Sequence, residues 1–247
     1  MSAVDAATLT VAEQMAVALA RLLRDGETVF FGVASPLPMV AALLARRLHA
    51  PRLTILDIVG GVNPAPGSLP VSTVDPRLLD GSSALVTLAD VFDLSARGRL
   101  DTAFLSGVEI DRMGRINLSV IGDVHRPKVR LPGGAGSAAL MPTARRTILW
   151  RTRHDPRTLV SELSFVTAAG NVDRLVTPLC VFRRVDGLLT VESIHPTSGP
   201  DEVRARTGFP VEVGPETPLT PPPTDAERAA LRSIDPDGIV AAEFRGR

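Results

Sequence analysis

The sequence predicts an α/β fold in which a largely parallel sheet is flanked by helices and antiparallel strands follow toward the C-terminus. Two observations predict it. Residues 8–56 alternate a helical pattern and an apolar strand pattern twice, which is typical of parallel strands joined by helical crossovers. Residues 174–183 and 188–194 are strand-like runs separated by Asp186-Gly187, the pattern of an antiparallel pair.

Local signals place the elements in the first half of the chain. Apolar residues recur at helical spacing from residue 8 to 24, and Thr10 with Glu13 fits a capping box. Pro36 favours the start of a second helix. The predicted elements are helix 8–24, strand 27–33, helix 39–49, strand 53–56, a long loop over 59–76, helix 85–96 and strand 102–105.

The second half of the chain is rich in short strands and turns. Proline and glycine break it repeatedly, and Thr224 is placed to cap a last helix. The predicted elements are a polar turn at 109–115, a β-rich run at 116–121, a charged bend at 123–128, a short strand at 129–131, a glycine loop at 132–138, strands 146–150 and 163–167, the antiparallel pair, and helices 201–206 and 225–234.

A chain of 247 residues is long enough to bury a substantial core. One domain is expected over residues 1–214. Residues 215–247 begin with a proline-rich run and are expected to form a tether and a C-terminal helix that packs on the same domain.

Composition excludes several classes of function. The chain carries 27 basic and 27 acidic side chains, so its net charge is zero and no electrostatic footprint for nucleic acid or an anionic membrane is present. The absence of a signal-peptide pattern and of an apolar run of about 18 residues predicts a cytoplasmic protein. The single Cys180 excludes an internal disulfide and is expected to be a buried thiol. No cluster has metal-ligand spacing.

Residues 106–138 are expected to shape a site. They combine tight turns with a loop that contains Gly133, Gly134 and Gly136, and glycines let backbone N–H groups approach an anionic or carbonyl oxygen closely. Asp57 ends a strand of the predicted parallel sheet, and ligands gather at the carboxyl ends of such strands. These two regions therefore form the candidate site.

Several motifs coincide, in unbroken order, with one family. The run Gly107 to Asp111, followed by Gly114 and Asn117, is similar to G-A-x-x-D-x-x-G-N-x-N, and loop 132–138 is similar to G-S-G-G-A-N. Residues 164–170 are similar to D-(Y/F)-V-T-S-P-G, and 195–209 to Y-P-T-S-S-P-E-D-V-x-x-N-T-G-F. The chain thus resembles the β subunit of class I CoA-transferases of the glutaconate CoA-transferase type.

The resemblance implies a CoA-transferase-like fold, a homologous α subunit as partner and a coenzyme A thioester as substrate, with no permanently bound cofactor. In the family, a glutamate carboxylate of the β subunit attacks the acyl-CoA thioester and forms an acyl-glutamyl anhydride. A glutamyl-CoA thioester follows, and CoA finally passes to an acceptor carboxylate. Backbone donors of Gly133, Gly134, Ala135 and Gly136 suit the developing oxyanion.

The family's catalytic glutamate aligns with Asp57, and here the chain departs from the pattern. An aspartate side chain is one methylene shorter, about 1.5 Å, and a misplacement of about 1 Å costs on the order of a hundredfold in rate. Three interpretations of Asp57 stay open: a nucleophile on a shifted backbone, a general base that directs water at the thioester, or a structural remnant. Some relatives in the family hydrolyse acyl-CoA instead of transferring CoA.

Other residues are candidates as well. Glu109, where relatives often have Gln, is a second candidate catalytic carboxylate, although a solvated or salt-bridged turn residue is the plainer interpretation. Asn117 is a candidate substrate-binding residue that is expected to bond to backbone across the turn. Lys128, the only lysine, is a candidate contact for CoA phosphates. His49 and His154 are expected at the surface.

The sequence therefore predicts a β-type subunit of a heteromeric enzyme that acts on acyl-CoA thioesters, by CoA transfer between carboxylates or by diverged hydrolysis. The alternative is a non-catalytic subunit that supports a catalytic α-type partner. A third hypothesis is a homo-oligomeric acyl-CoA enzyme without an α partner.

Overall fold

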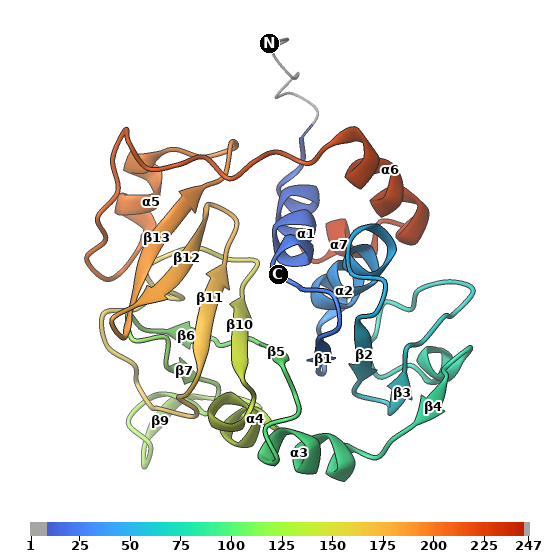
Figure 1. Ribbon diagram of the computed structural model, residues 1–247. Helices are drawn as coiled ribbons and strands as arrows, with labels where there is room; N and C mark the ends of the chain where they lie inside the picture. The colour runs from blue at the N-terminus through green and yellow to red at the C-terminus, as the bar shows by residue number, and fades with distance from the viewer. Residues whose placement is uncertain (1–8, 245–247) are drawn as a thin grey trace. The chain divides into compact units, whose positions relative to one another are not determined.

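The computed structural model describes residues 9–244, which form two compact units. The first contains the described residues up to Phe104 together with those from Pro222 onward, and the second contains residues 105–221. Each unit holds helices and strands (Figure 1). The domain boundary expected between residues 214 and 215 stays a prediction, because compactness alone does not show where a domain folds independently.

A parallel sheet forms the centre of the first unit. β1 (Thr28–Phe31) pairs in parallel with β2 (Thr54–Asp57) on one side and with β5 (Thr102–Leu105) on the other. The short strands β3 (Gly61–Val62) and β4 (Ala84–Leu85) extend it in antiparallel fashion beyond β2. The predicted parallel sheet is confirmed, and it places Asp57 at the carboxyl end of β2.

The helices of the first unit follow the predicted signals closely. Thr10 and Glu13 form the expected capping box of α1, and α1, α2, α6 and α7 pack against one another. The helix expected from residue 85 begins later, because Thr87 caps it and residues 84–85 join the sheet. The helices are α1 (Val11–Arg21), α2 (Pro36–Leu48), the 3-10 turn η2 (Pro76–Leu79), α3 (Leu88–Ala96), α6 (Asp225–Ile234) and α7 (Ile239–Ala242).

The second unit is built on a mixed sheet. β10 (Arg146–Trp150) pairs in parallel with β11 (Val172–Val176), and β12 (Cys180–Val185) pairs antiparallel with β11 and with β13 (Leu188–Ile194). The single strand expected over 174–183 is wrong. The chain reverses at Thr177-Pro178, where Thr177 Oγ1 accepts a hydrogen bond from Cys180 N.

Two small hairpins and two helices complete this unit. Residues 163–167, expected as a strand, form none; Ala168 makes only an isolated bridge to Ile116. The glycine loop runs directly into a helix that the sequence did not predict, α4. These elements are β6 (Glu109–Ile110) paired with β7 (Ile116–Asn117), β8 (Val120–Gly122) paired with β9 (Pro127–Arg130), α4 (Ser137–Thr143) and α5 (Pro200–Arg206).

Candidate functional site

The side chain of Asp57 points into the turn that follows β2 rather than toward solvent. The residue is only 1% exposed, and Oδ1 accepts hydrogen bonds from the backbone N–H groups of Gly60 and Gly61, each at 2.9 Å. Oδ2 is buried and has no hydrogen-bond partner among the described residues. Burial raises the pKa of this carboxyl above its usual value, although the amides of Gly61 and Gly60 act in the opposite direction.

The turn after β2 leaves no room around the Asp57 carboxylate. A Cβ on Gly61 would lie 2.6 Å from Asp57 Oδ2 and 2.7 Å from both Leu78 O and Ser82 Oγ, so residue 61 must be glycine. Gly60 has φ +104°, a conformation that favours glycine. The local geometry thus uses Asp57 to close the turn between β2 and β3.

Glu109 lies at the start of β6 in the second unit and is buried, with 7% exposure. Its Oε2 accepts hydrogen bonds from Asn117 Nδ2 at 2.8 Å and from Ser164 N at 2.9 Å. Its Oε1 accepts one from Ser164 Oγ at 3.0 Å. The expectation of a solvated or salt-bridged residue is wrong: among the described residues Glu109 has no ion pair, and neutral donors fix its orientation.

Asn117 and Thr167 connect Glu109 to the glycine loop. Asn117 Nδ2 also donates to Val120 O at 2.7 Å, and its Oδ1 accepts from Ser119 N at 2.9 Å, which confirms the predicted bonding to backbone across the turn. Thr167 Oγ1 accepts from Leu118 N at 2.8 Å and lies 2.7 Å from Ser119 Oγ. The two side chains therefore hold the short segment between β7 and β8 from both sides.

The glycine loop is attached directly to that segment. Gly133 N donates to Leu118 O at 2.8 Å, and Gly133 has φ +92°. A Cβ on Gly134 would lie 2.5 Å from Thr167 Cγ2, so Gly134 packs against the threonine methyl group. Within residues 9–244 the amide N–H groups of Gly134, Ala135 and Gly136 donate no hydrogen bond, and none of the three residues is fully buried. These amides are free to bind an oxygen atom.

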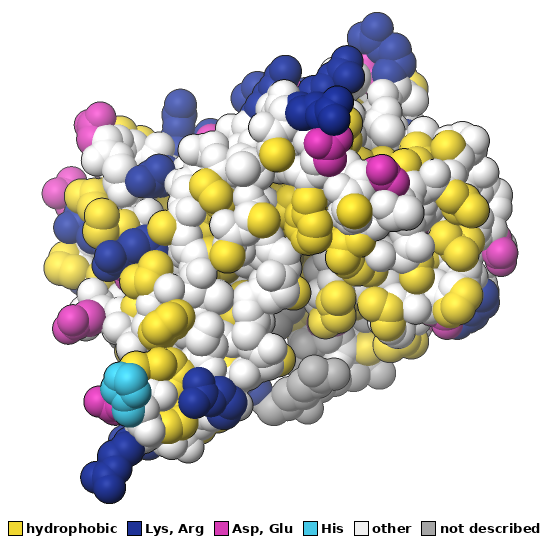
Figure 2. Space-filling view, turned by 90° about the horizontal axis from the view of Figure 1, so that it is seen from below, with side chains coloured by type: hydrophobic (Ala, Val, Ile, Leu, Met, Phe, Trp, Pro, Cys, Tyr) yellow, Lys and Arg dark blue, Asp and Glu magenta, His cyan; other side chains and the backbone are white. Residues whose placement is uncertain are grey.

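Lys128 and Arg130 are exposed on β9, and Arg126, just before this strand, is exposed as well. Val129 between them is 49% exposed. On the face shown in Figure 2, Lys and Arg side chains lie in separate groups beside hydrophobic ones instead of covering one continuous surface. Lys128 is thus accessible to an anionic ligand.

His154, expected at the surface, is in fact buried, with 3% exposure. Its ring nitrogens lie 2.8 Å from Thr177 Oγ1 and 2.9 Å from Thr207 Oγ1. Burial lowers the pKa of His154 to about 3 and that of the buried His195 to about 4. Both rings are therefore neutral structural links near pH 7. Cys180 is buried as predicted, and burial raises its thiol pKa.

Within residues 9–244, no group of three or more His, Cys, Asp or Glu side chains is arranged to hold a metal ion. Every helix in the described part of the chain is too short or too polar to span a bilayer.

The structure brings Glu109, Asn117 and the glycine loop together in the second unit, while Asp57 lies in the first. A buried carboxylate is thus linked through Asn117 and Leu118 to a loop with free amides, and such amides can stabilise negative charge on an oxygen atom. Sequence reasoning overlooked Ser164 and Thr167, which make the decisive contacts. The signal was present, since both fall in the motif at residues 164–170.

Comparison with known proteins identifies the family. The family model described as coenzyme A transferase matches residues 12–206. The B subunit of the 3-oxoadipate CoA-transferase of Pseudomonas knackmussii is 31% identical, over 90% of this chain and 92% of that protein. The cholesterol ring-cleaving hydrolase IpdB subunit of Mycobacterium tuberculosis is 29% identical, over 96% of this chain and 99% of that protein.

A solved structure of the decarboxylase AibA/AibB matches with a TM-score of 0.89 and 37% identity, over 95% of this chain and 98% of that chain. The chain therefore belongs to the coenzyme A transferase family. The resemblance to β-type subunits of that family, predicted from the motifs, is confirmed.

Proposed function

We propose that this chain is the β-type subunit of a heteromeric enzyme that, with a homologous α subunit, acts on an acyl-CoA thioester. One observation carries the proposal: the free amides of Gly134, Ala135 and Gly136 adjoin the segment that Asn117 and Thr167 hold, and Glu109 is bonded to Asn117. Adjacent amide donors stabilise the oxyanion that forms when a thioester carbonyl is attacked.

Each candidate has a distinct role in this proposal. The amides of the glycine loop bind the thioester oxygen, and Asn117 positions the loop. Within residues 9–244, Glu109 Oε1 accepts only one hydrogen bond, from Ser164 Oγ, and this oxygen takes a proton from the attacking water, whose oxygen then bonds to the thioester carbon. The C–S bond breaks, and CoA leaves as a thiolate that takes up the proton. Lys128 is positioned on an exposed strand and suits a CoA phosphate.

The geometry of Asp57 favours a diverged reaction over CoA transfer through this residue. A nucleophilic oxygen must reach the thioester carbon, but Asp57 is 1% exposed, its Oδ1 accepts hydrogen bonds from two backbone amides, and its Oδ2 lies against Gly61 in a turn without room even for a Cβ. This supports the interpretation of Asp57 as a structural residue of the turn. Hydrolysis, the class of reaction for which the IpdB relative is named, therefore ranks above transfer for this chain.

Decarboxylation of an acyl-CoA is a second candidate. It is favoured by the 37% identity and 0.89 TM-score to the decarboxylase AibA/AibB. In that case the bond between carbon and a carboxylate breaks, CO₂ leaves, and the carbon takes up a proton while the thioester stays intact.

The experiment uses the chain co-expressed and co-purified with its α-type partner and incubated with a panel of acyl-CoA thioesters. Free CoA is measured with and without an added acceptor carboxylate, and CO₂ is measured in parallel. Hydrolysis gives free CoA and free acid without acceptor, transfer gives a new acyl-CoA only with acceptor, and decarboxylation gives CO₂ without free CoA.

Variants of this chain separate its own chemistry from support of a catalytic partner. Glu109→Gln is expected to lower kcat by at least about a hundredfold, whereas Asp57→Asn is expected to keep most activity. Borohydride trapping followed by mass spectrometry of peptides should find no adduct on Asp57. An adduct there would restore the transfer mechanism, and unchanged kcat in Glu109→Gln would favour a non-catalytic β-type subunit.

A cytoplasmic location and the absence of a permanently bound cofactor stay predictions from the sequence. The acyl-CoA itself is proposed as a substrate that enters and leaves in each cycle.

A further inference from the structure

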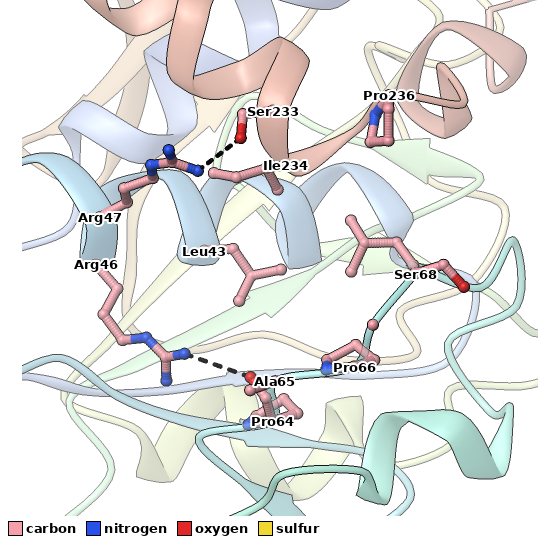
Figure 3. Close-up of a pocket in the computed structure, with 12 residues that line it drawn as sticks. Leu43, Arg46, Arg47, Pro64, Ala65, Pro66, Ser68, Ser233, Ile234 and Pro236 are labelled. Atoms are coloured by element: carbon pink, nitrogen blue, oxygen red, sulfur yellow. Dashed lines mark hydrogen bonds between the residues drawn. The ribbon is translucent and has the colours of Figure 1, made fainter.

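A cavity of about 380 Å³ opens on the first unit, between α2, the segment that follows β3, and the end of α6. Figure 3 shows Arg46 and Arg47 on one side of it, Ser68 on the opposite side, and Leu43 and Ile234 between them. The volume lies within the range of small-molecule sites, about 300–1,000 Å³. The cavity plays no part in the proposed catalysis.

One side of the cavity carries positive charge that no acidic side chain among residues 9–244 neutralises. Leu43, Arg46 and Arg47 lie three and four residues apart on α2, so they share one face of the helix. Neither arginine has a carboxylate partner among residues 9–244. Arg46 donates only to neutral oxygens, Asn63 Oδ1 at 3.1 Å and Pro64 O at 3.3 Å, and Arg47 donates to Ser233 Oγ at 3.0 Å.

These hydrogen bonds hold the two arginine side chains in place and leave several of their N–H donors free. A guanidinium has five N–H groups in a fixed fork, and the bonds to Asn63, Pro64 and Ser233 occupy only a few of them. Arg46 is half-buried, and burial lowers its pKa because no nearby anion offsets the cost of the charge. If Arg46 only fixed the loop at Asn63 and Pro64, its side chain would not need to carry a charge.

Most of the remaining lining is apolar, and Ser68 and Ser233 are its polar side chains. Leu43, Leu69 and Ile234 are half-buried, and Pro66 lies beside them. A ligand that fits must therefore carry negative charge at one end and an apolar body next to it, with the option of a hydrogen bond to Ser68 at the far end. Carboxylate and phosphate groups both match the bidentate geometry of arginine.

We propose that this cavity binds a small organic anion, with its carboxylate or phosphate on Arg46 and Arg47 and its apolar body on Leu43 and Ile234. Two sources share this chemistry in a solution that contains acyl-CoA: the nucleotide end of coenzyme A and a free short-chain carboxylic acid. Neither Asp57 nor the glycine loop lines this cavity.

The test is a binding titration of the full chain, alone and together with its α-type partner, at low and at physiological salt. One arm uses adenosine 3′,5′-bisphosphate and the other uses hexanoate. Arg47→Gln should weaken binding about tenfold, the loss of one charge-assisted contact. Leu43→Trp should abolish it by filling the cavity. Arg232→Gln, an exposed arginine of α6 that does not line the cavity, should leave it unchanged.

Binding of the bisphosphate alone assigns the cavity to coenzyme A, and binding of hexanoate alone assigns it to a free acid. The proposal is overturned if neither probe binds more tightly than about 10 mM, or if Arg47→Gln and Arg232→Gln behave alike. Because binding is measured without turnover, this result is independent of whether the chain acts on acyl-CoA. Thermal melting of Leu43→Trp shows whether that variant is folded.

Discussion

Ser164 binds both oxygens of Glu109: its backbone N–H donates to Oε2 at 2.9 Å and its hydroxyl donates to Oε1 at 3.0 Å. Ser164 therefore fixes the orientation of the Glu109 carboxylate with two donors, one on its backbone and one on its side chain.

This pairing predicts a non-additive effect on stability. Ser164→Asp alone sets two carboxylates against each other in a buried site and should cost roughly 2–4 kcal/mol. Glu109→Gln alone should cost less than about 1 kcal/mol, because the amide oxygen still accepts and the Ser164 hydroxyl can reverse its role. The double variant Glu109→Gln with Ser164→Asp should recover most of the loss. Chemical denaturation of the four chains checks this, and simple additivity would contradict it.

Gly134 and Thr167 form a second pair that substitution can separate. Gly134→Ala places a methyl group 2.5 Å from Thr167 Cγ2 and should destabilise the loop by about 1–3 kcal/mol. Thr167→Ser removes that methyl group but keeps the hydroxyl that accepts from Leu118 N. The double variant Gly134→Ala with Thr167→Ser should therefore regain stability and activity. Gly134→Ala combined with Thr167→Val should not regain them. Equal losses in the single and double variants would show that the contact does not position the loop.

Asp57 should respond to pH in a direction opposite to most carboxylates. Because burial raises its pKa in the folded chain, its contribution to stability is full below the unfolded value of 3.8 and is lost as pH rises through the folded value. Asp57→Asn keeps an oxygen for the amides of Gly60 and Gly61 and carries no charge. We expect this variant to melt at or above the wild-type temperature at pH 8, with the advantage shrinking toward pH 4.

Asp57→Ala is the matched control for that experiment. It leaves the buried amide of Gly61 without an acceptor, whereas Gly60 N–H keeps Asp57 O at 3.2 Å, and it should cost roughly 1–3 kcal/mol. If Asp57→Asn is as unstable as Asp57→Ala at pH 8, the carboxylate is ionised and needed as such, and the interpretation of Asp57 as a turn-closing residue is wrong.

Because His154 and His195 are buried, we expect the protein to lose stability in mild acid. Both have lowered pKa values in the folded chain, about 3 and about 4, against 6.5 when exposed. Unfolding therefore takes up protons as pH falls from 6.5 toward 4, at up to about 1.4 kcal/mol per pH unit for each ring. The pH slope of the unfolding free energy measures this. His154→Gln should reduce the slope, and an unchanged slope in this variant would contradict the prediction.

The sequence predicted most of the first unit because its signals are local. The capping box of Thr10 and Glu13 and the strand that ends at Asp57 follow from neighbours in the chain. The second unit was predicted less well. Residues 163–167 have a strand composition, but Ser164 and Thr167 bond to Glu109 and to Leu118, which are far away in sequence.

The candidate site was also predicted only in its local features. The free amides of the glycine loop follow from its composition, but the burial of Glu109 depends on residues 55 positions away. His154 gave no local sign of burial, since its partners Thr177 and Thr207 come from two other segments. Short-range patterns predict turns and caps, whereas the environment of a side chain depends on tertiary contacts.

The central claim is that the amides of Gly134, Ala135 and Gly136 bind the oxygen of an acyl-CoA thioester. The most direct measurement is amide hydrogen exchange of the complex with its α-type partner, with and without a saturating thioether analogue whose acyl carbonyl is retained. We expect these amides, which donate no hydrogen bond in the described structure, to become protected when the analogue binds. Unchanged exchange at all three positions, with the analogue demonstrably bound, would contradict the account.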